Sequence, residues 1–356
     1  MSFGASIPND PAVANVWCPP LAAGQPPDEP PPPGGWDAFL AELRFEPLSN
    51  SKRHKLVSGD GREFFAASVV GQGTTGTVTE YRSPAGAPAS LAVKHFKRIP
   101  LGSSEVREVE NVERMTFIDS WRARKRVVAK LGAPQVPDRV PARVVYLSNG
   151  EPRIVMPRAR GAVPDLNRLP VASALTVTRA VFKEVKSMYE TYGLLCGDLK
   201  SANLLVTCDQ HDPHVRPADY GGYANVNSEV GATYPAPWRL TRLYDGHMFS
   251  LMTEEECVYQ FFPFFVRLVY PTTRYPVQPD TNLLSYTSVL DELDGKHQRV
   301  KETHEAILKL TWPADVRSFL EYCTRYRLQG RDYDMTLETR TLAGLHNVLV
   351  DAVQID

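Results

Sequence analysis

The sequence of 356 residues has no excess of charge of either sign. Its 40 lysines and arginines stand against 41 aspartates and glutamates, which gives a formal charge of −1. Without a basic excess there is no strong attraction to a phosphate backbone, so nucleic acid is not expected as a partner. Local basic clusters such as Arg122–Arg126 are interpreted as solvated helix or loop surface.

Cysteine and long apolar runs are also scarce. The five cysteines are an odd number and include no Cys-x-x-Cys pair, which fits reduced thiols better than a disulfide framework. The start of the chain shows no basic segment followed by an apolar core, so no signal peptide is visible. The most apolar stretch, Phe261–Tyr270, is interrupted by Pro263 and Arg267 and is shorter than the roughly 20 residues that span a bilayer. We therefore expect a cytoplasmic protein with no membrane partner.

Proline, in contrast, is abundant, with 30 residues in the chain. Ten of them lie between Pro8 and Pro33. Residues 1–35 cannot bury enough apolar surface to offset the entropy of ordering, so we predict a flexible leader there. Pro30–Pro33 favours polyproline II, and a partner with an aromatic groove is the alternative role for this leader.

The remaining chain changes from strand patterns to helix patterns. Residues 36–50 are predicted as a short helical extension, because Trp36, Phe39, Leu40 and Leu43 recur at helical spacing. Strands are predicted over 64–70, 76–81, 90–96, 143–147 and 152–156, with a hairpin turn at Asn149-Gly150. Helices are predicted over 103–130 and 176–192. The pattern indicates a strand-rich first half, a connector near 157–168 and a helix-rich second half.

A glycine-rich segment lies between the first two of these strands. Gly71, Gly73, Gly76 and Val78 form the pattern Gly-x-Gly-x-x-Gly-x-Val. Glycines at this spacing let the backbone approach a polyphosphate and present its N–H groups to it. The position between two strands argues against a dinucleotide-binding turn, which joins a strand to a helix. Alone, the pattern is weak evidence.

A lysine follows one strand later. Lys94 ends the segment Leu91-Ala92-Val93-Lys94, and its apolar neighbours predict a half-buried strand. An ammonium group in that setting is costly unless it meets an anion, which a bound phosphate would supply. An edge-strand lysine that points to water is the alternative.

The third pattern is the most specific. Asp198, Lys200 and Asn203 form Asp-x-Lys-x-x-Asn between a long helix and an apolar strand, and Asp219-Tyr220-Gly221 follows. These segments supply a possible base, a lysine and two oxygen side chains that could bind a metal. Either segment alone could be a polar loop without chemistry.

Together these patterns resemble a eukaryotic-type protein kinase, over about residues 50–350. The glycine loop, the strand lysine, the catalytic loop and the Asp-Tyr-Gly segment occur in the family's order. The resemblance implies an α+β, bilobal protein kinase-like fold. It divides the chain into the leader (1–35), the helical extension (36–50), a strand-rich N-lobe (51–158) and a helix-rich C-lobe (159–356).

The resemblance implies ATP as a cofactor. The three glycines would cover its phosphates, Lys94 would hold the α- and β-phosphates, and Glu113, with Glu110 as the alternative, would orient Lys94. Ala92 and Leu205 would enclose the adenine. Met156 would be the gatekeeper before a hinge of Pro157, Arg158 and Ala159. The implied nucleotide-binding residues are Gly71, Gly73, Gly76, Val78, Ala92, Lys94, Met156, Pro157, Ala159 and Leu205.

The resemblance also assigns the transfer chemistry. Asp198 would accept or orient the substrate hydroxyl, and Lys200 would neutralise the transferring phosphoryl group. Asn203 and Asp219 would bind Mg²⁺. A lysine two residues after the base resembles the serine/threonine branch, which implies a protein substrate.

The chain departs from the family where the family braces and regulates its catalytic loop. Cys196-Gly197 replaces the usual His-Arg, so a switch by phosphorylation of the activation segment is not expected. That segment ends at Tyr234–Trp238, with tryptophan in place of the family's glutamate, so Arg331 need not pair there. The aspartate that braces the catalytic loop from the next helix has two candidates, Asp245 and His247, and the choice stays open.

Several further side chains have two interpretations. Cys196 is interpreted as a buried, inert thiol, with a redox-sensitive thiol as the alternative. The phenylalanines at 261, 262, 264 and 265 are predicted to lie in the core, with an exposed docking surface as the alternative. His211 and His214 are interpreted as a solvated turn, because no further metal ligands are nearby.

Three functions are compatible with these residues. An active serine/threonine kinase is favoured, because all the catalytic side chains are present. A kinase-fold protein that binds nucleotide or a partner without turnover is the second. A related small-molecule kinase is the third, because Cys196-Gly197-Asp198 resembles the His-Gly-Asp of such enzymes, although Tyr234–Trp238 resembles a peptide-docking element.

Overall fold

The computed structural model describes most of the chain outside the leader. The described residues are 32, 34–49, 53–73, 75–84, 88, 90–128, 142–159, 161–162, 169–209, 212–231, 240–244, 247–270, 304–324, 328–329, 332–333 and 340–350. Most of the predicted leader (residues 1–31 and 33), the 234–238 segment, Asp245, His211 and Arg331 lie outside them.

The chain forms two compact units. One contains residues 1–163 with 204–221, and the other contains residues 164–203 with 222–356. Residues 204–221 fall in the predicted 159–356 segment, yet they pack with the first unit. The reason is strand pairing: β10 (Leu204–Asp209) pairs with β8 (Gly161–Ala162) and with β11 (Asp212–Pro217).

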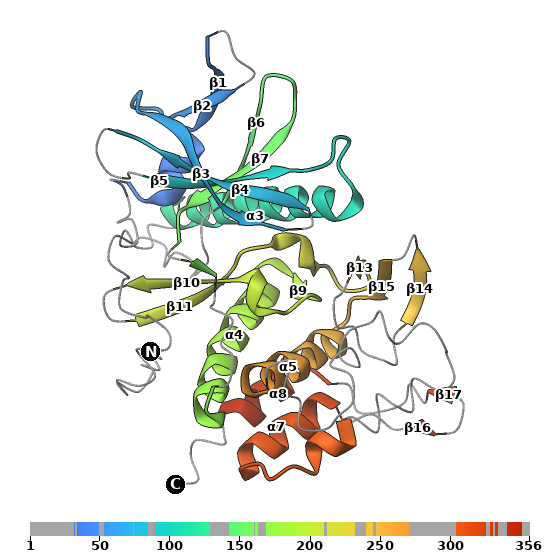
Figure 1. The fold of residues 1–356 in the computed structure, drawn as a ribbon. Coiled ribbons are helices and arrows are strands. Elements are labelled where there is room, and N and C mark those ends of the chain that lie inside the picture. The colour runs from blue at the N-terminus through green and yellow to red at the C-terminus, as the bar shows by residue number, and fades with distance from the viewer. Residues whose placement is uncertain are drawn as a thin grey trace. The chain divides into compact units, whose positions relative to one another are not determined.

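The first unit is built on a seven-stranded sheet in the order β1-β2-β3-β4-β5-β7-β6, with antiparallel pairing throughout (Figure 1). The strands are β1 (Arg44–Pro47), β2 (His54–Val57), β3 (Glu63–Gln72), β4 (Gly76–Arg82), β5 (Ser90–Phe96), β6 (Arg143–Tyr146) and β7 (Pro152–Pro157). Helix α3 (Ser103–Val128) connects β5 to the β6–β7 hairpin, whose turn contains Gly150 at a φ of 84°. Glycine favours that turn because it adopts positive φ without steric cost.

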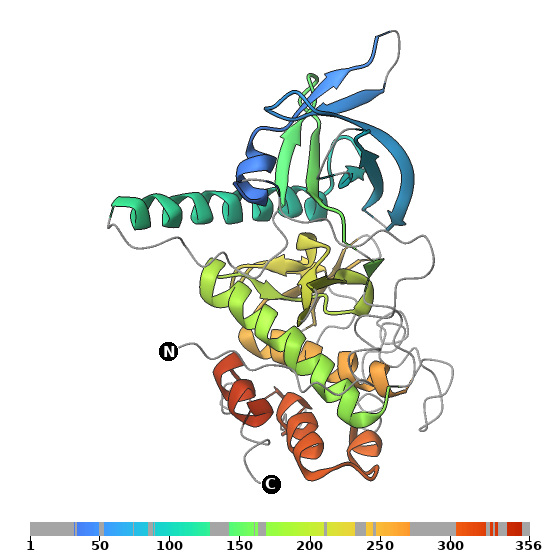
Figure 2. The same cartoon turned by 90° about the vertical axis from the view of Figure 1, so that its left-hand side faces the viewer.

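The two faces of the sheet have different chemistry. Side chains alternate along a strand, so every second residue shares a face. Tyr81, Leu91, Val93 and Val155 lie in one buried cluster with Phe39 and Leu40 of α2 (Trp36–Ala41). Figure 2 shows α2 beside the green strands β6 and β7. Ala92, Lys94 and Met156 alternate with these residues and lie on the opposite face of the sheet, where they are also buried.

The second unit is mainly helical. It contains α4 (Val171–Tyr192), α5 (Glu254–Val269), α7 (Ala314–Thr324) and α8 (Leu342–Val350), which pack on one another (Figure 1). Its short strands are β9 (Leu195–Cys196), β12 (Tyr223–Ala224), β13 (Glu229–Gly231), β14 (Leu240–Tyr244), β15 (His247–Leu251), β16 (Leu328–Gln329) and β17 (Asp332–Tyr333), with 3-10 turns η1 (Ser201–Asn203) here and η2 (Tyr220–Gly222) at the unit boundary. Gly193 ends α4 in the left-handed conformation that glycine favours.

The predicted fold class is confirmed: a strand-rich N-terminal sheet precedes a helix-rich C-terminal region. The predicted strands over 64–70, 76–81 and 90–96 correspond to β3, β4 and β5. The helical extension ends earlier than predicted, because residues 44–47 pair with β2 as a strand. The phenylalanines at 261, 262, 264 and 265 are buried in α5, so they belong to the core. Of the helices in the described ranges, none combines the length and hydrophobicity that a bilayer crossing needs.

A buried histidine makes the stability of the second unit sensitive to acid. His304 Nε2 lies 3.2 Å from the Tyr259 hydroxyl, and its ring lies 4.7 Å from the centroid of Phe262. Burial lowers the pKa of His304 to about 3. The folded protein therefore binds fewer protons here than the unfolded chain, whose histidine pKa is about 6.5. The free energy of unfolding must fall as the pH drops through this window.

We expect His304 to lower the free energy of unfolding by about 2 kcal/mol when the pH is lowered from about 7.5 to about 5. His304→Gln should remove that part of the pH dependence, as measured by urea unfolding at both pH values. His54→Gln is the control, because His54 is only partly buried on β2. An unchanged pH dependence in His304→Gln would show that the folded protein does not hold this imidazole neutral.

Candidate active site

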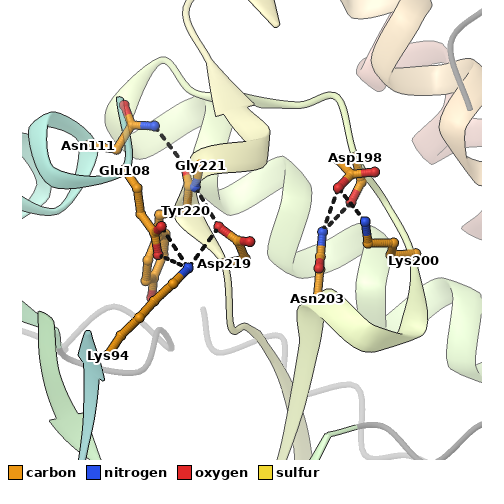
Figure 3. Close-up of polar contacts among 9 residues, drawn as sticks. All are labelled: Lys94, Glu108, Asn111, Asp198, Lys200, Asn203, Asp219, Tyr220 and Gly221. Atoms are coloured by element: carbon orange, nitrogen blue, oxygen red, sulfur yellow. Dashed lines mark hydrogen bonds and ion pairs between the residues drawn. The ribbon is translucent and has the colours of Figure 1, made fainter. Parts of the chain in front are cut away.

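Lys94 and Glu108 form a buried ion pair in the first unit (Figure 3). Lys94 Nζ lies 2.7 Å from both carboxylate oxygens of Glu108. The side chains are 7% and 1% exposed. Strand β5 supplies the lysine and α3 supplies the glutamate. The predicted alternative, a lysine that points to water, is therefore wrong.

The charges around Lys94 determine its protonation. Burial alone would lower the pKa of Lys94, but the negative charges of Glu108 and Asp219 outweigh that effect and raise it above its ordinary value. Burial and the charge of Asp219 raise the pKa of Glu108, and Lys94 opposes that rise. Lys94 therefore remains protonated, and its contacts hold the Glu108 carboxylate in position.

The prediction that Glu113 orients Lys94 is corrected by this geometry. Glu113 is exposed and accepts a hydrogen bond from the Tyr146 hydroxyl at 2.6 Å. Five residues turn a helix by about 140° beyond a full turn, so Glu108 and Glu113 face different directions. Glu108 shares the buried face of α3 with Val112 and Met115 at i+4 and i+7. That periodicity would have selected Glu108 from the sequence; the other predicted alternative, Glu110, is exposed.

Asp219 joins this cluster from the segment after β11. Its Oδ1 lies 3.5 Å from Lys94 Nζ and accepts a hydrogen bond from the Gly221 N–H at 2.9 Å (Figure 3). A Cβ at Gly221 would lie 3.1 Å from both Asp219 Oδ1 and Ser104 Oγ, so a side chain would crowd the turn. Asn111 Nδ2 also donates to the Tyr220 carbonyl at 2.8 Å. The sequence interpretation missed Asn111, which shares the buried face of α3 with Glu108.

The glycine-rich turn connects β3 and β4. Gly73 N–H donates to the Gly76 carbonyl at 2.9 Å. A Cβ at Gly76 would lie 2.7 Å from the His95 carbonyl oxygen, a contact that real side chains do not make. Lys97 donates from Nζ to the Gly73 carbonyl at 2.5 Å. Gly76 is thus required by the close approach of β5, whereas a Cβ at Gly71 would meet only ordinary contacts.

The predicted adenine-binding residues occupy the first unit. Val78 pairs with Lys94, and Ala92 pairs with Met156, across neighbouring strands. Leu205 pairs with Ala162 in the β8–β10 ladder. Pro157 ends β7, and Arg158 and Ala159 follow it.

A second polar cluster lies in the other unit. Asp198 Oδ2 accepts hydrogen bonds from Lys200 Nζ at 2.8 Å and from Asn203 Nδ2 at 2.9 Å (Figure 3). Asn203 Nδ2 also lies 2.9 Å from the Asp198 carbonyl oxygen. The side-chain amide nitrogen of Asn203 donates to Asp198. The side-chain oxygen of Asn203 is therefore the atom that could bind a metal. The predicted base, lysine and metal-binding amide are therefore neighbours in space.

Each unit contains one proposed magnesium ligand, Asp219 in the first and Asn203 in the second. Magnesium is usually held by one or two carboxylates, substrate phosphates and water, not by an all-protein cage. The described residues contain no group of three or more histidine, cysteine or acidic side chains that could hold a metal. Asp219 and Asn203 supply oxygen atoms of the type that magnesium binds.

Two buried thiols brace the segment before Asp198. The Cys257 thiol of α5 is in hydrogen-bonding contact with the backbone of Cys196. The backbone of Asp198 and the hydroxyl of Tyr223 lie within reach of the Cys196 thiol. Gly197 N–H donates to the Gly222 carbonyl at 2.9 Å. From the sequence, Asp245 and His247 are candidates for a residue at the start of the next helix that braces the segment of Asp198. Helix α5 begins after both of them, at Glu254. Asp245 and the His247 side chain lie outside the described residues.

Comparison with solved structures shows the fold. A structure of vaccinia related kinase 3 matches with a TM-score of 0.54 and 14% sequence identity, over 89% of this chain and 94% of that chain. Many other solved chains also match. No protein-family model matches the sequence, and no curated protein matches it. The chain therefore has a protein kinase-like fold, in a sequence that has diverged far from the matched structure.

Glu108→Gln should destabilise the protein by about 3 kcal/mol, because it removes the nearer of the two carboxylates that compensate the buried ammonium of Lys94. Urea unfolding of each variant measures this change. Glu113→Gln is the matched control on the same helix and should change the free energy of unfolding by less than about 1 kcal/mol, as is usual at exposed sites. Equal effects at the two positions would contradict the assignment of Glu108.

The buried thiols should be inert in the folded protein. Burial raises the pKa of Cys196 to about 12 and raises the pKa values of Cys257 and Cys323 well above normal. Because the thiolate is the reactive form, we expect iodoacetamide at about pH 8 to leave all three unmodified. Labelling in urea is the positive control, and mass spectrometry reads both reactions. Rapid labelling of Cys196 in the folded protein would restore the redox-sensitive interpretation.

Proposed function

We propose that this protein transfers the γ-phosphoryl group of ATP to serine or threonine hydroxyls of a protein substrate, with Mg²⁺. The observation that carries the proposal is the buried Lys94–Glu108 pair with Asp219 beside it. A buried pair costs desolvation energy and is weak evidence for stability alone. The position of this pair beside a third charge, that of Asp219, favours a role other than stability.

The first cluster supports nucleotide binding. Lys94 binds the α- and β-phosphates, and Glu108 holds the ammonium in position. Gly76 lets the turn approach the phosphates closely, while Val78, Ala92 and Leu205 contact the base. Phosphates that draw Lys94 away from Asp219 leave this carboxylate to the metal.

The second cluster supports the transfer step. Asp198 accepts or orients the proton of the attacking hydroxyl, and Lys200 neutralises charge on the phosphoryl group as it moves. Asn203 holds Asp198 and offers its carbonyl oxygen to the metal. Bound Mg·ATP supplies the reactive phosphoanhydride and the divalent charge. The proposal requires both clusters to act on the same nucleotide, so each is tested by its own variant.

Asp198→Asn should lower the rate of ADP formation by about 100-fold or more, because general-base assistance typically contributes 10²–10⁴-fold. Asp219→Asn should abolish the stimulation by Mg²⁺. The assay follows ADP release with Mg·ATP and a library of peptides and generic proteins, and mass spectrometry identifies the phosphorylated residues. Asp37→Asn, an exposed change on α2, is the control.

The alternatives give different results in the same experiments. Thermal stabilisation by Mg·ATP without ADP release across the library would identify a nucleotide-binding protein without turnover. Phosphate on a sugar or an aminoglycoside, and not on peptides, would identify a small-molecule kinase. Either result would overturn the proposed activity. A partner of the proline-rich leader stays a prediction, since most of the leader lies outside the described residues.

A further inference from the structure

Glu80 is a buried carboxylate outside the clusters described above. Its side chain is 2% exposed and contacts two arginines. Oε1 lies 2.9 Å from Arg158 Nε, and Oε2 lies 2.9 Å from Arg82 Nη2. Ser68 Oγ of β3 also donates to Oε2 at 3.1 Å. One carboxylate thus connects β3, β4 and the segment after β7.

The strand register places Glu80 on the proposed nucleotide face of the sheet. Glu80 pairs with Ala92, and Ala92 pairs with Met156, so the three residues form one cross-strand row. Residues of one row share a face. Val78 and Lys94 form the row two residues along, on the same face. Glu80 therefore belongs to the row of the base-binding residues, not to the row of the phosphate-binding lysine.

Arg158 lies at the position where the proposed function needs a fixed backbone. The residue follows Met156 and Pro157 and precedes Ala159, in the segment that the resemblance assigns to the nucleotide-binding hinge. Its side chain is 20% exposed, so its ion pair with Glu80 is largely shielded from water. Because a guanidinium is always charged, the 2.9 Å contact keeps a positive charge beside the buried carboxylate.

The two arginines on Glu80 are not equivalent. The Arg82 side chain is 61% exposed and belongs to the same strand as Glu80. It can balance the carboxylate charge but adds no link between distant segments. Arg158 instead connects the segment after β7 to β4, across the row that contains Ala92. Its contribution therefore depends on where its backbone lies and not only on its charge.

We propose that Glu80 and Arg158 are positioning residues that hold residues 157–159 against β4 and so determine affinity for the purine base. This inference rests on the proposed function and deepens it. The pair acts on base recognition and leaves phosphate binding to Lys94. Loss of the pair should therefore weaken the binding of ligands that contain the base and leave the binding of ligands that contain only phosphate unchanged.

The test compares three ligands on the full-length protein. Dissociation constants for ATP, adenosine and inorganic tripolyphosphate are measured by calorimetry in Mg²⁺, for wild type and Arg158→Met. We expect about tenfold weaker binding of ATP and adenosine and less than a twofold change for tripolyphosphate. In turnover, KM for ATP should rise about tenfold with kcat changed less than twofold. Equal losses for all three ligands would indicate a merely structural role and overturn the inference.

Two further variants complete the design. Arg82→Met removes the exposed arginine from the same carboxylate and should leave all three affinities within twofold. Glu80→Gln should reproduce the pattern of Arg158→Met, and the double variant should bind no more weakly than either single variant. Should Glu80→Gln fail to fold, Arg158→Met decides alone.

The outcomes separate this inference from the proposed function. Wild type that binds none of the three ligands would overturn both. Wild type that binds ATP and turns it over, together with Arg158→Met that binds ATP and adenosine with unchanged affinity, would overturn the positioning role alone.

Discussion

Much of the arrangement of the first unit depends on the contact between Lys94 and Glu108. Two opposite charges have been removed from water, which is favourable only with close geometry and further polar partners. The two 2.7 Å contacts from one ammonium to both carboxylate oxygens meet that requirement. They also fix the rotation of α3 about its axis, because only one face of the helix can present Glu108 to β5.

The same rotation of α3 determines a second contact. Asn111 lies three residues after Glu108, close to it on the helix surface. Its amide bonds the backbone of Tyr220, next to Asp219. The helix therefore places the lysine partner and anchors the segment that carries the proposed metal ligand. A shift of α3 would disturb both, which links the charge of Lys94 to the position of Asp219.

The alternation of side chains on β4 and β5 explains how one sheet serves two purposes. Tyr81, Leu91 and Val93 belong to the buried apolar cluster that includes residues of α2, and this cluster stabilises the sheet. The intervening residues bring Glu80, Ala92 and Lys94 to the other face. Since a one-residue slip would exchange the two sets, the apolar cluster also protects the register of the polar residues.

The patterns that depend on a few neighbouring residues were predictable from the sequence. The strands around the glycine turn, the hairpin at Gly150 and the Asp198–Asn203 cluster follow from turn chemistry, alternation and motif spacing. The choice of Glu113 over Glu108 failed because spacing along a motif was preferred to the buried face of α3. Strand β1 was missed because its residues were included in the helical extension predicted over 36–50, and β2 was not predicted. The roles of Glu80 and Asn111 gave no local signal, since Arg158 and Tyr220, which link them to other segments, are distant in sequence.

The segment around Asp198 is surrounded by buried groups that the sequence did not identify as its neighbours. The described structure places neutral thiols beside the backbone of Cys196 and Asp198, whereas Asp245, one of the two candidates for the bracing residue, lies outside the described residues. A buried thiol costs little to desolvate and bonds weakly, whereas a buried carboxylate needs strong donors. Lys200 and Asn203 both donate hydrogen bonds to Asp198 Oδ2 and so help to orient its carboxylate. These two residues therefore carry a positional role in addition to their proposed chemical roles, so substitutions at either one should be interpreted through the geometry of Asp198 as well as through charge and metal binding.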